Sequence, residues 1–74
     1  MTVEPIYGAI GARIRYMREA LGIQQAELAK RVGLTRTSIV NFEAGKQRCM
    51  LHDIEKMAGA LGTTPKHLLK GLWI

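Results

Sequence analysis

Cysteine and long apolar runs are the two features that this sequence most lacks. Cys49 is its single cysteine, so no internal disulfide can form. The longest stretch without a charged side chain, residues 57–65, is about half as long as a membrane-spanning helix. The first residues lack the basic and then apolar pattern of a signal peptide. These absences predict a cytoplasmic protein, and a free thiol agrees with a reducing compartment.

Catalytic and metal-binding patterns are also missing. The chain has no glycine-rich phosphate loop and no nucleophile paired with a base, and its acidic residues are dispersed. Cys49, His52 and His67 are the soft metal ligands, but their spacing matches no zinc site. We therefore expect no enzymatic activity, no metal and no cofactor.

Length and charge narrow the possibilities further. With 74 residues the chain has room for one domain and one core. Its hydrophobic content of 47% and charged content of 23% are typical of a globular protein rather than a disordered one. Lysine and arginine number 11 against 6 acidic residues, which gives a formal net charge of +5. A surplus of this sign favours a polyanionic partner such as nucleic acid or an anionic membrane.

Apolar residues recur at helical spacing along the chain, without a convincing alternation of the kind that marks strands. Ile10, Ile14, Met17 and Leu21, for example, form one stripe that ends at Gly22. Glycines, and a capping threonine before proline, mark other boundaries. The pattern predicts an all-α fold with helices at about residues 6–21, 24–32, 35–44, 51–61 and 65–70.

The same spacing assigns a buried face to the fourth helix. Its inward stripe is expected to contain Leu51, Ile54, Met57, Ala58 and Leu61. For the chain as a whole we expect a flexible arm at residues 1–5 and a single domain over residues 6–74, which ends in an apolar tail.

The segment between residues 25 and 44 is the most informative part of the sequence. Ala29 is small where two crossed helices must touch, and Gly33 follows at a sharp turn. Thr35 can cap the next helix by accepting a hydrogen bond from a backbone N–H. Apolar residues on both sides of the turn are expected to point into one core: Leu28, Val32, Leu34, Ile39 and Phe42. This spacing is typical of two short, tightly crossed helices.

The segment QAELAKRVGLTRTSIVNFEAGK resembles the helix-turn-helix of the phage-repressor and Cro-like family, also called XRE-type. Arg18 and Leu21-Gly22 before it, and LHDIEKMAGALG and TTPKHLL after it, also follow that family's layout. The resemblance covers about residues 8–70. It implies a compact, five-helix, lambda-repressor-like DNA-binding domain, in which the second and third helices form the helix-turn-helix and the third enters the DNA major groove.

The resemblance implies a set of base-contacting residues on the third helix: Arg36, Thr37, Val40 and Asn41. These side chains lie opposite the apolar face of that helix. Arg36 can donate two hydrogen bonds to guanine, Asn41 can pair with adenine, and the methyl groups of Thr37 or Val40 can meet a thymine methyl. The alternative is that all four are simply solvent-facing residues.

A second set of residues is expected to contact DNA phosphates. Gln25 matches the family's phosphate-binding glutamine at the start of the second helix, where free backbone N–H groups already favour an anion. Lys46 and Arg48 lie in the loop after the third helix, and Ser38 adds a hydroxyl donor. Ordinary solubilising charge is the alternative role for the two cations.

The resemblance also implies a structural ion pair between Arg18 and Glu43, which joins the first helix to the third. Two positions depart from the family's pattern. Met50 stands where a capping serine or threonine commonly begins the fourth helix, although Asp53 can still oppose the helix dipole. Cys49 replaces a frequent proline, and its closeness to basic residues raises the hypothesis of a depressed thiol pKa and a redox role. An inert loop thiol is the alternative.

Leu69, Leu72, Trp73 and Ile74 give the chain an apolar C-terminal end. We expect this end to form a homodimer interface, and the alternative is that Trp73 folds back onto its own domain. The sequence thus predicts a sequence-specific regulator of transcription, a repressor that binds a palindromic operator in double-stranded DNA as a homodimer, with no membrane partner. Two alternatives stay open: the antitoxin of a toxin–antitoxin pair, and a protein-interaction module that has lost DNA reading.

Overall fold

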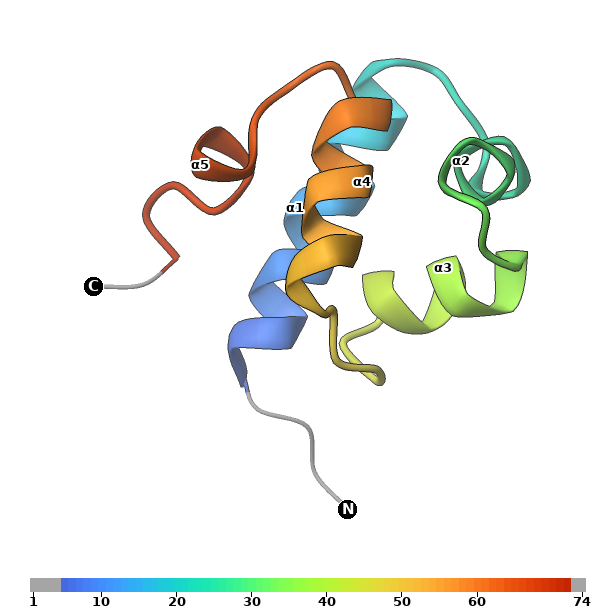
Figure 1. Ribbon diagram of the computed structural model, residues 1–74. Helices are drawn as coiled ribbons and strands as arrows, with labels where there is room; N and C mark the ends of the chain where they lie inside the picture. The colour runs from blue at the N-terminus through green and yellow to red at the C-terminus, as the bar shows by residue number, and fades with distance from the viewer. Residues whose placement is uncertain (1–4, 73–74) are drawn as a thin grey trace.

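The computed structural model describes residues 5–72 and contains five helices in that part of the chain (Figure 1). They are α1 (Pro5–Ala20), α2 (Gln25–Val32), α3 (Arg36–Glu43), α4 (Leu51–Ala60) and α5 (Pro65–Leu68). No strand occurs among the described residues. The all-α prediction is confirmed, and the largest difference in a boundary is at α5, which ends at Leu68 instead of Lys70.

The helices pack so that α3 lies at one border of the molecule. It packs against α1 and α2, while α2 also packs against α4, and α5 packs against α4 and α1. In Figure 1, α3 runs across the direction of α1 and α4, and α2 is seen end-on beside it. Because only one side of α3 meets other helices among residues 5–72, its opposite side is open to a partner in this part of the chain.

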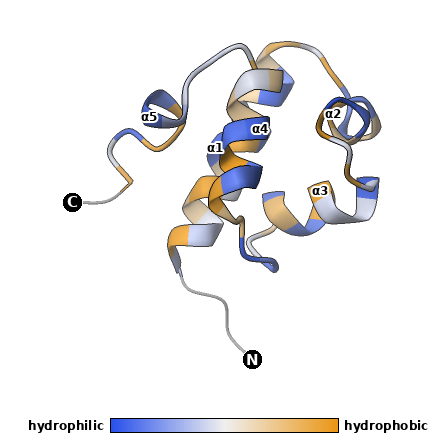
Figure 2. Cartoon of the chain, in the orientation of Figure 1, coloured by the Kyte–Doolittle hydropathy of each residue, from blue (hydrophilic) through white to orange (hydrophobic). Residues whose placement is uncertain are grey.

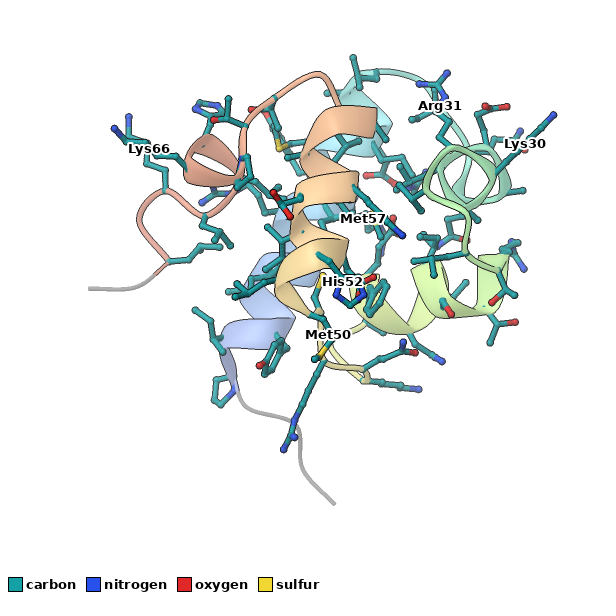
Figure 3. The ribbon with its side chains drawn as sticks, viewed as in Figure 1. Lys30, Arg31, Met50, His52, Met57 and Lys66 are labelled. Atoms are coloured by element: carbon teal, nitrogen blue, oxygen red, sulfur yellow. The ribbon has the colours of Figure 1, made fainter. Side chains whose placement is uncertain are left out.

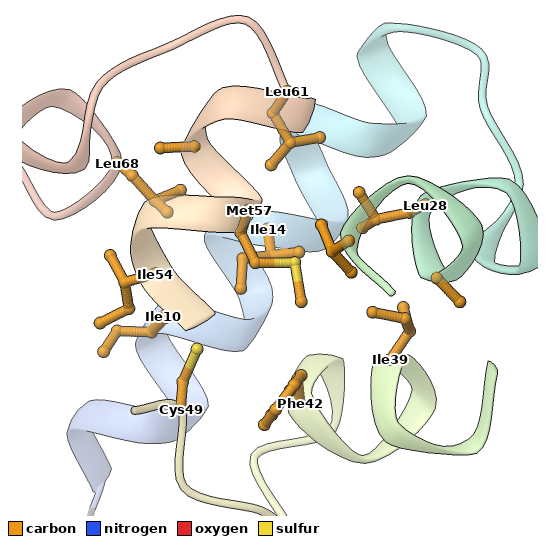
Figure 4. Packing of buried hydrophobic residues seen from close by; sticks show 13 residues of the cluster. Ile10, Ile14, Leu28, Ile39, Phe42, Cys49, Ile54, Met57, Leu61 and Leu68 are labelled. Atoms are coloured by element: carbon orange, nitrogen blue, oxygen red, sulfur yellow. The ribbon is translucent and has the colours of Figure 1, made fainter. Parts of the chain in front are cut away.

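A single core lies between the helices (Figure 4). Every helix contributes to it, and its completely buried large side chains are Ile14, Leu28, Ile39, Met57 and Leu68. Figure 2 shows hydrophobic and hydrophilic positions following one another along α1 and α4, as expected of helices with one buried face. Most of the inward positions inferred from helical spacing are therefore confirmed, including Ile10, Phe42 and Ile54.

Two expected core residues are instead exposed. Leu21 is 54% exposed and Leu51 is 76% exposed, so the prediction that they complete the stripes of their helices is wrong. Both residues lie at a helix end, where helical spacing ceases to determine direction. Leu21 follows the last residue of α1, and Gly22 then reverses the chain with a φ of 71°. Leu51 is the first residue of α4, with no preceding helical turn beneath it.

Helix ends are stabilised by side chains that the sequence allowed us to identify. The hydroxyl oxygens of Thr35 and Thr64 accept hydrogen bonds from the backbone N–H groups of Ser38 and His67, each at 3.1 Å. At α4, where a hydroxyl cap is lacking, the carboxylate of Asp53 accepts the backbone N–H of Met50 at 3.1 Å. One carboxylate therefore opposes the helix dipole and also satisfies a free backbone donor.

Cys49 is buried between α3 and α4, and its surroundings contradict the hypothesis of a depressed pKa. Burial away from water, with a smaller contribution from Asp53, raises the pKa of the Cys49 thiol to about 12. Both effects disfavour the thiolate, which is the reactive form. The neighbouring basic residues do not reverse this result because Lys46 and Arg48 are exposed to solvent.

Two close contacts that sequence reasoning missed hold α1 in place. A Cβ on Gly11 would overlap the backbone carbonyl of Phe42, so α1 and α3 touch where only glycine fits. The guanidinium of Arg13, also on α1, donates to the carbonyl oxygens of Leu68 at 3.2 Å and Lys70 at 3.1 Å. These bonds satisfy carbonyl groups at the end of α5 and just after it.

Candidate nucleic-acid interface

The turn between α2 and α3 has a defined geometry. Gly33 ends α2 with a φ of 71°, a left-handed conformation that glycine adopts without strain. The backbone N–H of Leu34 then donates to the carbonyl of Ala29 at 2.9 Å. Thr35 caps α3 immediately afterwards. The two helices are thus joined by a short turn whose backbone groups are hydrogen-bonded, which fixes the direction of α3.

The outward side of α3 contains the residues predicted to contact bases. Arg36 and Thr37 are exposed, and Val40 and Asn41 are half-buried, whereas Ile39 and Phe42 on the other side are buried. Among residues 5–72, the side chains of Arg36, Thr37 and Asn41 take part in none of the hydrogen bonds that stabilise the fold. Their donors and acceptors are therefore available to a ligand.

Positive charge beside α3 is not compensated in the described part of the chain. Arg36 at the start of α3, and Lys46 and Arg48 in the following loop, are exposed and belong to no ion pair among residues 5–72. Elsewhere Arg15 and Arg31 are paired within their own helices, Arg31 with Glu27 at 3.0 Å, and Arg18 is paired with Glu43 of α3. Exposed lysines on other helices are also unpaired among residues 5–72, but α3 and the loop that follows it carry three of the cations that remain for a polyanion.

A shallow polar depression lies between the starts of α2 and α3. It is lined by Arg18, Gln24, Gln25, Ala26 and Arg36. The first backbone N–H groups of α2 have no partner within the helix, so this end of α2 favours an anion. Gln25, the predicted phosphate-binding residue, is the first residue of α2. Its side-chain amide already donates one hydrogen bond to Glu43 Oε1 at 3.1 Å, a contact that the sequence did not indicate.

Arg18 and Glu43 form a buried ion pair, as the family resemblance implies. Arg18 Nε lies 2.7 Å from Glu43 Oε2, and Arg18 Nη2 donates to Glu43 Oε1 at 3.0 Å. The two side chains are only 9% and 4% exposed. The hydrogen bond to Glu43 raises the pKa of Arg18, and this effect exceeds the opposing effect of burial. The third guanidinium nitrogen, Nη1, donates to the carbonyl of Ile23 at 2.8 Å.

The remaining predicted site residues have the following positions. Ser38 is half-buried, and its hydroxyl oxygen accepts a hydrogen bond from the Thr35 hydroxyl at 3.2 Å. Leu69 and Leu72 are half-buried and pack against the core. Trp73 and Ile74 lie outside the described residues. The structure thus brings the predicted base and phosphate residues to one region but leaves their contacts with DNA as predictions.

One apolar surface was not anticipated from the sequence. Met50 is 57% exposed, and together with Leu51 it borders a groove between the starts of α1 and α4. Ile6, Tyr7 and other apolar residues line the groove. In Figure 3, Met50 lies at the foot of α4, next to the start of α1. The sequence does not indicate this surface, because helical spacing predicts that Leu51 is buried.

Residues 5–72 contain no group of three or more His, Cys, Asp and Glu side chains that could hold a metal ion. Over the same residues, the helices are too short or too polar to cross a membrane.

The crossed helices and their open face match a known family of DNA-binding domains. The family model described as Helix-turn-helix matches residues 14–68. The chain belongs to this family. It is an XRE-type helix-turn-helix protein, a DNA-binding regulator of transcription of the repressor type. The matched residues include α2, α3 and the turn between them, and α3 carries the open face.

Two curated relatives illustrate the similarity. The control protein C.BamHI of Bacillus amyloliquefaciens is 38% identical over 60 residues, which are 80% of this chain and 74% of that protein. The repressor protein of Salmonella phage P22 is 36% identical over 62 residues, which are 84% of this chain. The match spans only 29% of the length of the P22 repressor, so it concerns the DNA-binding part of the two chains.

Solved structures agree with this assignment. The restriction-modification controller protein C.AhdI from Aeromonas hydrophila superposes with a TM-score of 0.80 at 35% identity, and the match covers 84% of this chain and 90% of that one. The P22 repressor in complex with a synthetic operator superposes with a TM-score of 0.76 at 35% identity, over 84% of this chain and 94% of that one. The lambda-repressor-like fold expected from the sequence is confirmed.

Proposed function

We propose that the protein is a repressor that binds a palindromic operator as a homodimer and reads it with the outward face of α3. The observation that carries this proposal is the set of polar side chains on that face that make no hydrogen bond within residues 5–72, above all Arg36 and Asn41. The side chains lie on a helix whose direction is fixed by Gly33 and the Thr35 cap. A rigid support for free donors is what base recognition requires.

Each proposed base contact has a chemical role. Arg36 donates to O6 and N7 of guanine, and Asn41 pairs with N6 and N7 of adenine. Val40 and Thr37 offer apolar contacts to thymine methyl groups. A good two-bond contact discriminates against the wrong base by about 1–3 kcal/mol, so Arg36 and Asn41 would account for most of the specificity.

Phosphate contacts would hold the domain in register. The proposed phosphate contacts come from groups that can donate to anions, within α3 or near it in the sequence. They are the start of α2 with Gln25, the Ser38 hydroxyl, and the exposed cations Lys46 and Arg48. Neutral donors fix orientation, whereas the two cations release counterions and make binding depend on salt. Binding should therefore weaken as the salt concentration rises, with specificity retained at intermediate salt.

The proposal of a homodimer rests on size and on apolar surface. The domain measures 28 × 26 × 21 Å, while successive major grooves on one side of DNA are about 34–36 Å apart. One domain therefore reads one half-site, and two domains side by side reach both. Two apolar surfaces are available for their contact: the C-terminal end with Leu69 and Leu72, and the groove bordered by Met50 and Leu51.

We also propose that the protein has no enzymatic activity of its own. The carboxylates of Glu19, Glu27 and Glu43 are engaged in ion pairs, that of Asp53 caps α4, and Glu55 lies exposed on the surface of α4. A general acid or base would need a carboxylate that faces a substrate cavity with a shifted pKa. The polar depression is shallow, and its lining contains two arginines and no carboxylate, which suits an anion that is held rather than transformed.

Recovery of bound fragments from sheared genomic DNA tests the proposal. The wild type and the variants Arg36→Ala and Asn41→Ala are each incubated with the fragments at about physiological salt, and bound DNA is sequenced. Lys66→Ala is the matched control, because Lys66 is an exposed cation on α5, on the other side of the molecule from α2 (Figure 3).

The expected result is enrichment of one palindromic site by the wild type and by Lys66→Ala, and its loss in both α3 variants. The two half-sites should be centred about one helical turn apart, or a multiple of it. Recovery that is independent of sequence and disappears with added salt would contradict the proposal. It would favour a module that binds another protein and has only a basic surface left.

A further inference from the structure

The carboxylate of Glu43 lies where three segments of the chain meet. It is at the end of α3, and it accepts two hydrogen bonds from Arg18 on α1, at 2.7 and 3.0 Å. It accepts a third from the side-chain amide of Gln25, at the start of α2, at 3.1 Å. With only 4% of its side chain exposed, Glu43 is too deeply buried to touch DNA itself.

The same group of residues also holds the turn that leads into α2. Arg18 uses two guanidinium nitrogens for Glu43 and the third, Nη1, for the carbonyl of Ile23 at 2.8 Å. Ile23 precedes Gln25 by two residues, so the backbone before α2 and the first side chain of α2 are bound to one buried pair. The start of α2 is therefore fixed relative to α3 by side chains, in addition to core packing.

The chemistry of Glu43 determines how the Gln25 amide is oriented. An ionised carboxylate only accepts hydrogen bonds, so it selects the nitrogen of the amide and repels the oxygen. That nitrogen carries two hydrogens, and Glu43 takes one of them. Among residues 5–72 this amide makes no second hydrogen bond, and Gln25 lines the depression together with Gln24 and Arg36. A phosphate oxygen, like a carboxylate, only accepts hydrogen bonds.

We propose that Glu43 is a positioning residue for DNA binding, which holds the Gln25 amide so that its second N–H donates to a backbone phosphate. This inference rests on the proposed function, since it requires that the start of α2 meets DNA. This role and a purely electrostatic role of Glu43 predict opposite effects of a Glu43 substitution on DNA affinity. Removal of a negative charge from a DNA-binding protein should by itself strengthen binding, whereas loss of the positioned donor weakens it.

A double-mutant cycle tests the proposal, with the wild type, Glu43→Gln, Gln25→Met and the double variant. The probe is a duplex of random sequence at low salt, because a phosphate contact does not depend on sequence. Circular dichroism selects a temperature at which all four proteins are folded. Gln25→Met leaves the Arg18–Glu43 pair intact and removes the amide, so it isolates the contribution of the donor.

Glu43→Gln and Gln25→Met are each expected to weaken binding about tenfold, and the double variant should bind no more weakly than Gln25→Met alone. Equal weakening by Glu43→Gln in both backgrounds would overturn the proposal, and so would tighter binding of Glu43→Gln than of the wild type. Failure of the proposed function would look different: the wild type would bind the random duplex but enrich no genomic site.

Nuclear magnetic resonance of the wild type provides a second measurement if Glu43→Gln does not fold. The two side-chain amide hydrogens of Gln25 are assigned by their disappearance in Gln25→Met. Without DNA, one of them should be shifted and protected from exchange by Glu43, and addition of the duplex should shift the other. Equivalent behaviour of both hydrogens in the free protein, or no change on addition of the duplex, would refute the proposal.

Discussion

Substitution of Glu43 by alanine should destabilise the fold severely. The change leaves the guanidinium of Arg18, whose side chain is 9% exposed, without its carboxylate. Removal of one partner of a buried ion pair typically costs about 3–5 kcal/mol, because the remaining charge is desolvated and uncompensated. The total stability of a domain with 74 residues is about 4–11 kcal/mol. Glu43→Ala should therefore remove a large part of it.

Thermal unfolding followed by circular dichroism measures the effect. At about 4–8 °C per kcal/mol for a domain of this size, Glu43→Ala should lower Tm by about 12 °C or more. Glu27→Ala is the matched control, since it also removes a glutamate from an ion pair with arginine, but one that is roughly half exposed. An exposed pair contributes less than about 1 kcal/mol, so Tm of the control should change little.

Replacement of both partners distinguishes a buried charge from a lost contact. In the double variant Arg18→Met with Glu43→Leu no unpaired charge remains, so it should regain part of the stability that Glu43→Ala loses. The recovery should be incomplete because Ile23 and Gln25 lose their partners as well. If Glu43→Ala lowered Tm no more than Glu27→Ala does, the assignment of a stabilising buried pair would be refuted.

Three further predictions concern the contact between α1 and α3, the buried thiol and the charge beside α3. Gly11→Ala should lower the free energy of unfolding by about 1–3 kcal/mol, because the new methyl group overlaps the backbone of α3. Gly59→Ala, in open space within α4, should raise it by up to about 1 kcal/mol. Chemical denaturation measures both changes. The Cys49 thiol, with a pKa of about 12 against an ordinary 9.0, should react with a thiol reagent at pH 8 only after unfolding. The Cys49 thiol should not reduce the free energy of unfolding below about pH 9. Between pH 9 and 12 the free energy of unfolding should fall, because the thiol ionises first in the unfolded state. A Cys49→Ala variant should not show this loss. Lys46→Ala should weaken duplex binding and make the slope of log K against log salt concentration shallower by about one phosphate contact. An equal effect of Lys66→Ala would contradict a specific contact of Lys46 with phosphate.

The positions of the helices, of their turns and of most buried faces could be predicted from the sequence, because local signals determine them. Gly33 and Thr35 mark the turn before α3, and the spacing of Ile10 and Ile14, or of Ile54 and Met57, defines the buried faces. These signals act within a few residues, so no knowledge of the partner helices is needed. The same reasoning failed at Leu21 and Leu51, since helical spacing loses its meaning where a helix ends.

The candidate site could be predicted only in part. The open face of α3 follows from the position of its apolar residues, and the Arg18–Glu43 pair from the family resemblance. The bond between Gln25 and Glu43 could not be inferred, because it joins residues 18 positions apart and depends on how α2 and α3 cross. The contact between Gly11 and Phe42 is similar. Its one signal in the sequence is a glycine within a helix, where glycine is unfavourable by about 1 kcal/mol relative to alanine.

The buried pair connects the stability of the domain with its DNA-binding face. Arg18 and Glu43 join α1 to α3, and through Ile23 and Gln25 they also fix the start of α2. A substitution of Glu43 therefore changes the free energy of unfolding and the geometry of the phosphate contact together, and a loss of DNA binding by that variant alone has two explanations. Gln25 separates them, because its amide belongs to the contact while the ion pair persists without it. Binding to the phosphate should in turn stabilise the folded domain against unfolding, since any ligand that binds only the folded state stabilises it.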